Sequence, residues 1–508
     1  MNGHSNRPPV KKSIITSIKE YLIDYTTNSN LHGLRYIGEK ERTVVEKLFW
    51  FCMFICCLVV CGNKIMKVWN KWNENPVIVS FAETSTPVWQ IPYPAVTLCI
   101  ETKSKQTKFN YTEYHHLYRN KTTFPNLTEE ERYTFEDVSM ICDDNLAPLK
   151  GRYFSMFCKW NDVSWIKCEG LFYEVVTEEG FCYTFNSLGT NELYRLEKYL
   201  HHYKYLAVGR SNTSWTLDGG YPPNTPLETY PHRGSLYGAK TGLKVVLSVQ
   251  KKDLDYLCRG PAQGFKIFLH NPAELPRLSQ QYFRALLSQE VVVSVKPKMM
   301  TTSDGLRPYD PERRQCFFPN ERYLQYFKVY TQPNCEMECL TNFTFVRCGC
   351  IQLGMPRGPN IPVCNSGKMA CIRKAQKELV TIEIKSSLSG EDEDDTISEA
   401  REVASRCKCL PACISIKYDA ETSHADFDWN AVFRAFGSEL EELVFTSHVS
   451  IGIYVSFKEA QFITSRRSEL YGQTDFLANC GGLLGLFMGF SILSVAEIIY
   501  FLTILKCF

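Results

Sequence analysis

A single carboxylate near the end of a long apolar segment is the residue of this sequence that most needs a chemical explanation. Glu497 follows 21 uncharged residues, Phe476 to Ala496, and eight more uncharged residues separate it from Lys506. A carboxylate within an apolar helix is costly unless it faces water or a polar partner. One helix cannot enclose a water-filled path, so several copies must surround it. We therefore predict that Glu497 belongs to a ring of carboxylates that concentrates cations at the inner end of a pore.

The stretch Gly489, Phe490 and Ser491 precedes this carboxylate in the same apolar segment. Its glycine and serine mark a position where a helix can be interrupted. Irregular backbone at membrane depth is tolerated where it lines a cavity. Carbonyl groups here, with the Ser491 hydroxyl, could replace part of the water shell of an ion. Gly481 and Gly485 continue the four-residue spacing of small residues on one face. For these two glycines the alternative is close packing between helices, which this spacing also permits.

The cysteines indicate an oxidising compartment. Sixteen of the 22 lie in one continuous segment, and this even number predicts disulfides. Zinc is the competing interpretation, because two pairs of cysteines are separated by one residue. Zinc sites usually show two CxxC or HxxxH pairs, so we predict no metal site. The sequence leaves the pairing open, and the disulfide candidates include Cys99, Cys182, Cys316, Cys335, Cys339, Cys348, Cys350, Cys407, Cys409 and Cys413.

Glycosylation sequons and an acidic run lie in the same segment. Confinement of all five Asn-x-Ser/Thr sequons to it agrees with exposure outside the cell. The run Glu391–Asp395 holds five consecutive acids, which form either a solvated loop or a cation or proton sensor, because clustered carboxylates raise each other's pKa. The N-glycosylation candidates are Asn110, Asn120, Asn126, Asn212 and Asn342.

Nothing in the sequence favours catalysis or nucleic-acid binding. Lys plus Arg number 57 against 55 Asp plus Glu, so charge gives no reason to expect a nucleic-acid partner. His270 and Cys316 could suggest a Cys/His pair, but a cysteine in a disulfide-rich segment is expected to be bridged and His270 ends an apolar run. We interpret both as structural. No cofactor site is predicted, and the chain is not expected to be an enzyme.

The pore prediction requires membrane-spanning helices, and the sequence contains two apolar segments that could form them. Leu48 to Asn63 holds 16 uncharged residues, fewer than the roughly 20 that a spanning helix needs. Lys64 and Lys67 can extend their charged ends toward the interface, which lengthens the span. A buried helix of a soluble domain is the alternative. The second segment, which contains Glu497, is hard to interpret as anything but a spanning helix.

Orientation follows from charge and from the oxidised segment. Residues 1–47 carry eight Lys or Arg against five Asp or Glu, which favours a cytoplasmic N-terminus. We predict a plasma-membrane protein with both termini in the cytosol. Its expected regions are a cytoplasmic tail (1–47), a first transmembrane helix (48–69), an extracellular cysteine-rich domain (70–474), a second transmembrane helix with the pore and selectivity filter (475–505), and a cytoplasmic C-terminus (506–508).

The extracellular segment has the pattern of an α+β domain built on an antiparallel sheet. The region Cys316–Cys413 is expected to be a helical element stapled by several bridges. Alternating apolar residues predict strands at 94–100, 244–249, 264–270, 291–295 and 448–457. Helical periodicity predicts helices at 278–289, within 379–404 and at 429–443.

With these residues in view, the chain resembles the degenerin/epithelial sodium channel family over nearly its whole length, and looks closer to the arthropod pickpocket branch. Five dispersed motifs in the family's order carry the resemblance. They are His32-Gly33, Tyr93-Pro94-Ala95-Val96-Thr97-Leu98-Cys99, Gly180-Phe181-Cys182-Tyr183-Thr184-Phe185-Asn186, Cys407-Lys408-Cys409-Leu410-Pro411-Ala412-Cys413, and Gly489-Phe490-Ser491.

The resemblance implies a homo- or heterotrimer that passes Na+ down its gradient and is blocked by amiloride. By position in the family motifs, Ala478 matches the degenerin position, where bulky residues hold such channels open. Gly485 matches the residue implicated in amiloride block, and the pair His32-Gly33 matches residues that influence gating. Phe490 departs from the small residue usual in the middle of the filter, which puts strict selectivity for Na+ over K+ in question.

Two other functions compete with a conducting subunit. A non-conducting or modulatory receptor-like subunit of the same fold is the first, and Glu497 and the filter residues argue against it. The second is a two-helix channel gated by extracellular nucleotide, which would leave the five motifs unexplained. The gating stimulus stays open, and membrane lipid is the expected environment of the two spans.

Overall fold

The computed structural model describes residues 23–74, 77–101, 110–113, 116, 154–161, 163–165, 168, 171–198, 214–238, 241–257, 261–279, 281–364, 366–388, 398–435, 437 and 447–501. The chain falls into two compact units. The smaller comprises Met1–Val79, Ser303–Arg314 and Arg467–Phe508, and the larger comprises Ser80–Thr302 and Gln315–Arg466. Each unit holds residues that are far apart in the sequence.

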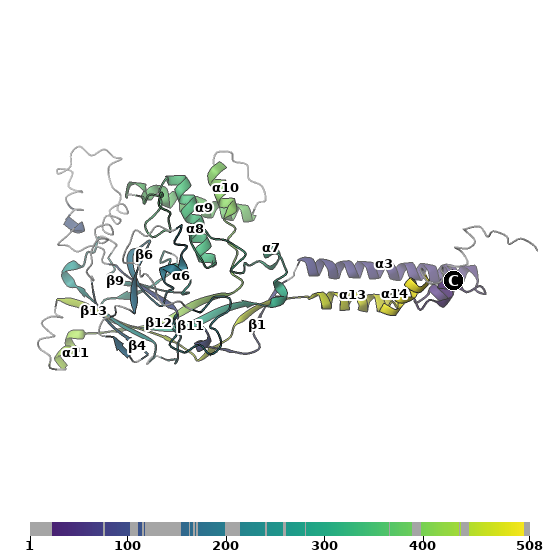
Figure 1. Cartoon of the computed structure of the whole chain (residues 1–508), viewed down its shortest axis with the longest axis horizontal. Coiled ribbons are helices and arrows are strands. Elements are labelled where there is room, and N and C mark those ends of the chain that lie inside the picture. Colours follow the sequence, from purple (N-terminus) through teal and green to yellow (C-terminus); the bar gives the residue numbers. More distant parts are fainter. Residues whose placement is uncertain are drawn as a thin grey trace, which may run out of the picture. The chain divides into compact units, whose positions relative to one another are not determined.

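The smaller unit is built from helices. A capping box at Thr43 and Glu46 starts the longest, because each side chain accepts a hydrogen bond from the other residue's backbone N–H. This helix, α3, has 31 residues and is long and apolar enough to cross a membrane. It packs beside α13, as Figure 1 shows in purple and yellow. The unit's helices are α2 (Leu34–Gly38), α3 (Val44–Glu74), α7 (Pro311–Arg314), α13 (Gln473–Met488) and α14 (Ile492–Ile499).

A large sheet forms the base of the larger unit. Alternate residues of β8, from Leu243 to Val249, are buried, which is the pattern of a strand with one face on the core. Its strand order is β1-β15-β11-β13-β8-β4-β5, and β12 pairs with β11 as an eighth strand off this path. The strands are β1 (Val77–Phe81), β4 (Phe154–Trp160), β5 (Val163–Trp165), β8 (Leu243–Gln250), β11 (Gln289–Thr302), β12 (Ser415–Asp426), β13 (His448–Phe457) and β15 (Ser465–Glu469).

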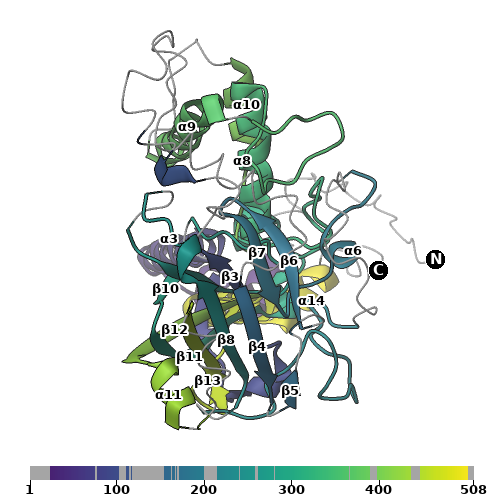
Figure 2. The ribbon, with the colours of Figure 1, turned by 90° about the vertical axis from the view of Figure 1, so that its left-hand side faces the viewer.

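The pairing in this sheet is mostly antiparallel, in agreement with the sequence prediction. β12 runs antiparallel to β11 over its whole length, and β8 pairs antiparallel with both β13 and β4. The exception is β11 with β13, which are parallel from Glu290 to Val295. Figure 2 shows β4, β8, β11 and β13 side by side.

A second sheet, ordered β10-β9-β3-β7-β6, brings two of the family-like motifs together. Val96 of β3 pairs with Phe185 of β7, and a disulfide joins Cys99 to Cys182. The Asn186 side chain donates to the backbone carbonyl of Tyr93 at 2.6 Å, which closes the pair. The strands are β3 (Ala95–Ile100), β6 (Phe172–Thr177), β7 (Gly180–Phe185), β9 (Gly264–His270) and β10 (Phe283–Leu286), and β2 (Thr86–Pro87) with β14 (Gln461–Phe462) forms a separate two-stranded pair.

Three helices gather in the larger unit and are stapled by disulfides, as predicted for residues 316–413 (green in Figure 2). They are α8 (Gln332–Cys348), α9 (Met369–Leu388) and α10 (Ser398–Arg406), and shorter helices are α6 (Thr190–Leu193) and α11 (Trp429–Ala435). Five bridges lie here: Cys316–Cys413, Cys335–Cys409, Cys339–Cys407, Cys348–Cys371 and Cys350–Cys364. Elsewhere in the described part, Cys99–Cys182 and Cys158–Cys168 are bonded.

The prediction of a helix at 278–289 is wrong. Residues Phe283–Leu286 form β10, which pairs antiparallel with Gly264–Ile267 of β9. Ser288 then adopts a φ of 62°, which turns the chain into β11. The periodic apolar residues suit either conformation, and pairing to an available sheet edge decides for the strand. Of the helix predicted at 429–443, residues 429–435 are helical and the remainder falls mostly outside the described residues.

Candidate functional site

The apolar segment that carries the predicted pore residues is a broken helix. α13 ends at Met488, α14 begins at Ile492, and the two are bent by 71°. Gly489 has a φ of +67°, in the left-handed region that favours glycine after a helix. A Cβ at Gly489 would also lie 2.8 Å from the imidazole of His32. Two independent constraints therefore require glycine at the first residue of the break.

The second half of the segment has its own N-terminal cap. The Ser491 hydroxyl accepts from the backbone N–H of Ser494 at 3.3 Å, and the Ser494 hydroxyl accepts from the N–H of Ser491 at 3.2 Å. This reciprocal pair fixes the start of α14. Gly489, Phe490 and Ser491 thus form a short irregular stretch between two defined helix ends.

A segment from the N-terminal end of the chain lies against both sides of this break. The backbone N–H of His32 donates to the carbonyl of Met488 at 3.0 Å. The Asn30 amide donates to the Glu497 carboxylate, which gives that carboxylate a polar partner. The rings of Tyr25 and Phe501 meet edge to face, 5.4 Å apart. His32, distant in sequence from the break, therefore lies against its first residue, Gly489.

The glycine stripe of α13 is open within this single chain. A Cβ on Gly481 or Gly482 would meet no atom of the described residues within 4 Å. A Cβ on Gly485 would make only an ordinary van der Waals contact within the described residues, with the Phe490 carbonyl oxygen 3.8 Å away. Ala478 is exposed. Packing of α13 on α3 thus leaves this face uncovered by the described chain, although sequence reasoning allowed that the glycines serve helix packing.

Aromatic residues link α3 to the first turns of α13 at the end opposite the break. Trp72 stacks on Phe476 with 5.2 Å between ring centroids, and its indole N–H donates to the carbonyl of Tyr471 at 3.1 Å. The Arg313 guanidinium lies 4.9 Å from the Trp72 ring and 4.7 Å from the Tyr309 ring. Sequence reasoning missed this cluster and Asn30, because no local pattern relates residues that are hundreds of positions apart.

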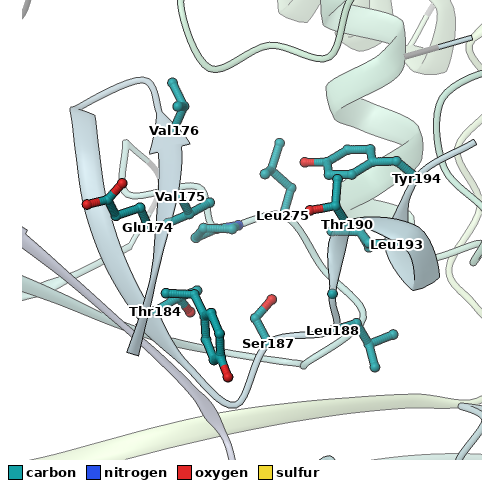
Figure 3. A pocket seen from close by; sticks show the side chains of 13 residues that line it. Glu174, Val175, Val176, Thr184, Ser187, Leu188, Thr190, Leu193, Tyr194 and Leu275 are labelled. Carbon is teal, nitrogen blue, oxygen red and sulfur yellow. The ribbon is translucent and has the colours of Figure 1, made fainter. Parts of the chain in front are cut away.

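The larger unit contains a small cavity between β6, β7 and α6, of about 50 Å³. Figure 3 shows Glu174 and Val175 of β6 on one side and Thr190 and Tyr194 on the other. Its volume suits a few water molecules and is too small for an organic ligand. It therefore adds no binding function to the larger unit.

The other predicted residues divide between described and undescribed parts of the chain. All ten disulfide candidates are bonded. Asn110 is described and half-buried, and Asn342 lies in α8, where the Thr344 of its sequon is fully buried. His270 is buried and unsuited to pairing with the bonded Cys316. Asn120, Asn126, Asn212 and the acidic run Glu391–Asp395 lie outside the described residues.

Comparison with known proteins decides the family. The family model described as amiloride-sensitive sodium channel matches residues 25–501. The chain belongs to this family. Its members are plasma-membrane ion channels that pass Na+ and assemble as oligomers, and they are not enzymes. This family member is a membrane protein, and its disulfide-rich domain is extracellular.

Several curated relatives align over nearly the whole length of this chain. Pickpocket protein 28 of Drosophila melanogaster is 29% identical, covering 96% of this chain and 79% of the relative. Sodium channel protein Nach of the same organism is 23% identical, covering 95% and 86%. Acid-sensing ion channel 1A of Danio rerio is 22% identical, covering 94% and 87%. The family match over residues 25–501 includes the break at 489–491 as well as the extracellular domain.

Proposed function

We propose that this chain is a pore-forming subunit of an amiloride-sensitive Na+ channel, in which three subunits surround a pore lined by α13, the break at 489–491 and α14. The observation that carries the proposal is the capped, broken helix. Its irregular residues Gly489, Phe490 and Ser491 interrupt an apolar segment, and at membrane depth such backbone is tolerated when it lines a cavity. They would form the selectivity filter, whose carbonyls replace part of the hydration shell of the ion.

The open face of α13 supports assembly around a shared axis. Gly481 and Gly485 have room for larger side chains within the chain itself. Small residues on an uncovered face allow helices of neighbouring subunits to approach, or leave space for a blocker. In this arrangement Gly485 would be the site of amiloride block, and Ala478 would be the position at which bulk holds the pore open.

The ends of the chain fit two spans with both termini in the cytosol. α3 would be the first span, and α13 with α14 would be one bent second span. Glu497 would then lie below the filter, where a ring of carboxylates concentrates cations. The contacts of Asn30 with Glu497 and of His32 with Met488 support a gating role for His32 and Gly33, which would act from the cytosolic side.

The test is current through the full chain in oocytes carrying Ala478→Val, with external Na+ replaced by a large organic cation. We expect a constitutive inward current that disappears on replacement, and a change in the Na+/K+ permeability ratio when Ser491→Ala is added. Leu477→Val, one residue before Ala478 on α13, is the matched control and should give no constitutive current. Loss of all current despite confirmed surface delivery would instead favour a non-conducting subunit of a heteromeric channel.

Block of this current by amiloride provides a second test of the proposal. The Cβ of Gly485→Leu would meet only an ordinary contact in the described chain, and the larger side chain would occupy the proposed pore face. We expect the half-blocking concentration of amiloride to rise by about tenfold, which corresponds to roughly 1.4 kcal/mol of lost binding. Gly62→Ala on α3, where a Cβ also meets no described atom, is the control and should leave block unchanged.

A further inference from the structure

A second cavity, of about 360 Å³, lies against the disulfide-linked helices of the larger unit. Its walls come from the loop at 322–325, one face of α8 and the last turn of α10. The volume falls in the range of roughly 300–1,000 Å³ typical of sites for small organic molecules. Cys335, Cys339 and Cys407 line it, and their bridges hold α8 to the end of α10. The cavity is therefore part of a cross-linked frame.

Most of the lining is apolar and partly open to solvent. Tyr323, Phe345 and Val346 line the cavity and are 65%, 37% and 41% exposed. Leu324 and Val403 complete the apolar wall. Aromatic and aliphatic side chains that remain exposed in a concave site favour a ligand with an apolar body, because binding would remove this surface from water.

A guanidinium group in the lining makes no ion pair within 4.0 Å among the described residues, although the carboxylate of Glu338 attracts it from farther away. Arg322 donates through Nη2 to the carbonyl of Arg406 at 2.6 Å. Its Nε is buried and has no hydrogen-bond partner among the described residues. No described carboxylate lies within ion-pair distance of this guanidinium. Nη1 and the second N–H of Nη2 have no hydrogen-bond partner among the described residues, and two such N–H groups side by side match the two oxygens of a carboxylate, so this group provides a place for an anion.

The neighbouring charges leave the cavity cationic. Glu338, the carboxylate of the lining, already accepts backbone N–H bonds from Gln325 at 2.7 Å and from Tyr326 at 2.9 Å. Arg406 pairs with Glu402 of its own helix. Arg195 lies outside the lining, where its guanidinium is 4.3 Å from the centroid of the Tyr323 ring and its Nε donates to the carbonyl of Leu324 at 3.0 Å. The lining therefore holds two guanidiniums, Arg322 and Arg406, against one carboxylate, Glu338, whose oxygens accept backbone N–H groups.

We propose that this cavity binds a small organic anion, a carboxylate attached to a compact apolar or aromatic body. Arg322 pairs with the ligand carboxylate, and the side chains of Tyr323, Phe345 and Val346 cover its body. A cationic ligand would meet the excess of guanidinium groups, and a purely inorganic anion would leave the apolar wall unused. The site lies in the extracellular domain and gives the channel a chemical input that is independent of its pore residues.

Protection of a cysteine in the lining tests the site without using channel current. Val346→Cys is expressed in the full chain at the oocyte surface, and the rate of its modification by an anionic, membrane-impermeant thiosulfonate is read by blocking of later biotin labelling. We expect 4-phenylbutyrate to slow modification by about fivefold or more, as near-saturating occupancy requires. The equally sized 4-phenylbutanol and 4-phenylbutylamine should not protect. Val380→Cys on α9, 53% exposed and outside the lining, should show no protection.

Substitution of the guanidinium decides whether charge recognition is specific. Arg322→Gln should abolish protection by 4-phenylbutyrate, whereas Lys377→Gln, an exposed charge on α9, should retain it. Arg322→Lys keeps the charge without the fork, and should retain partial protection even if the glutamine variant fails to reach the surface. Equal protection by all three probes, protection that survives Arg322→Gln, or no protection by 4-phenylbutyrate would each overturn the proposal. None of these outcomes depends on whether the chain conducts.

Discussion

At the scale of single residues, Gly489 shows how one position can combine two demands. Its positive φ suits the end of α13, and its missing side chain makes room for His32. The backbone N–H of His32 in turn donates to Met488, the residue just before the break. A change at Gly489 therefore acts on the conformation of the break, the proposed filter, and on the N-terminal segment at once.

Gly489→Ala should lower the current of the Ala478→Val channel, because the left-handed conformation costs a non-glycine residue about 1–2 kcal/mol and the new Cβ would collide with the imidazole. His32→Ala removes the colliding ring but leaves the backbone strain. We expect the double variant Gly489→Ala/His32→Ala to recover part of the current, measured per surface channel. No recovery would show that the backbone conformation alone accounts for the loss.

His270 is a second residue whose surroundings fix its state. It is 3% exposed, with Nε2 2.9 Å from the Thr97 hydroxyl and Nδ1 2.9 Å from the carbonyl of Asn271. Burial lowers the pKa of His270 from 6.5 to about 4. The histidine is therefore neutral in the folded domain and links β9 to β3.

This burial predicts a pH dependence of stability. Between pH 6.5 and about 4 the unfolded chain binds a proton at His270 that the folded chain does not, so stability falls as the pH falls through this window. The contribution is about 3 kcal/mol. Thermal unfolding of the purified chain should show a flatter pH dependence between 6.5 and 4 in His270→Gln than in the unsubstituted protein. Parallel pH profiles would contradict the assignment.

At the scale of elements, the contacts of Trp72 join the end of α3 to the start of α13 and to the segment 303–314. Its ring stacks on Phe476, and the guanidinium of Arg313 lies between it and Tyr309. Arg313 also donates to the Trp72 carbonyl at 3.2 Å. Such cation–π contacts contribute about 0.5–2 kcal/mol, more when the cation is desolvated. A movement of 303–314 would thus reach both helices through one side chain.

We predict that Trp72→Leu and Arg313→Gln each reduce the current of the Ala478→Val channel. Because the two side chains act through one contact, the double variant should reduce the current no further than the more severe single variant. Arg307→Gln, in the same segment but paired with Asp304, serves as the control for loss of charge. Fully additive losses would show that Trp72 and Arg313 act independently.

At the scale of the whole molecule, the two units correspond to two environments. The helices of the smaller unit carry exposed apolar side chains that suit lipid. Only 6% of the most apolar part of α3 is buried against other described residues. The larger unit holds seven disulfides in its described part and has a conventional buried core. These surfaces suit lipid around the helices of the smaller unit and water around the larger unit.

Topology tests this division. Epitope tags fused at either terminus should be inaccessible to antibody in intact cells and accessible after permeabilisation, as two spans require. Asn110→Gln should remove the mass of one glycan on a gel, because Asn110 belongs to the extracellular domain and is only half-buried. Staining of a terminal tag in intact cells would contradict two spans, and an unchanged mass would exclude glycosylation at Asn110.

The sequence by itself determined the features that repeat locally or depend on composition. The apolar segments, the strands at 94–100, 264–270 and 448–457 and the stapled helical region follow from periodicity and cysteine content, and the structure confirms these strands and this region. The motif residues 489–491 were also apparent, because a glycine and a serine within an apolar helix signal a break.

Only the tertiary structure decided which distant residues meet. The disulfide partners, the strand at 283–286, the contact of Asn30 with Glu497 and the cavity beside Arg322 all depend on chain segments brought together from far apart. Local propensity differs little between a helix and an edge strand at 283–286, so pairing with β9 outweighs it. A carboxylate in an apolar segment signals the need for a partner, but only the folded chain supplies the partner's identity.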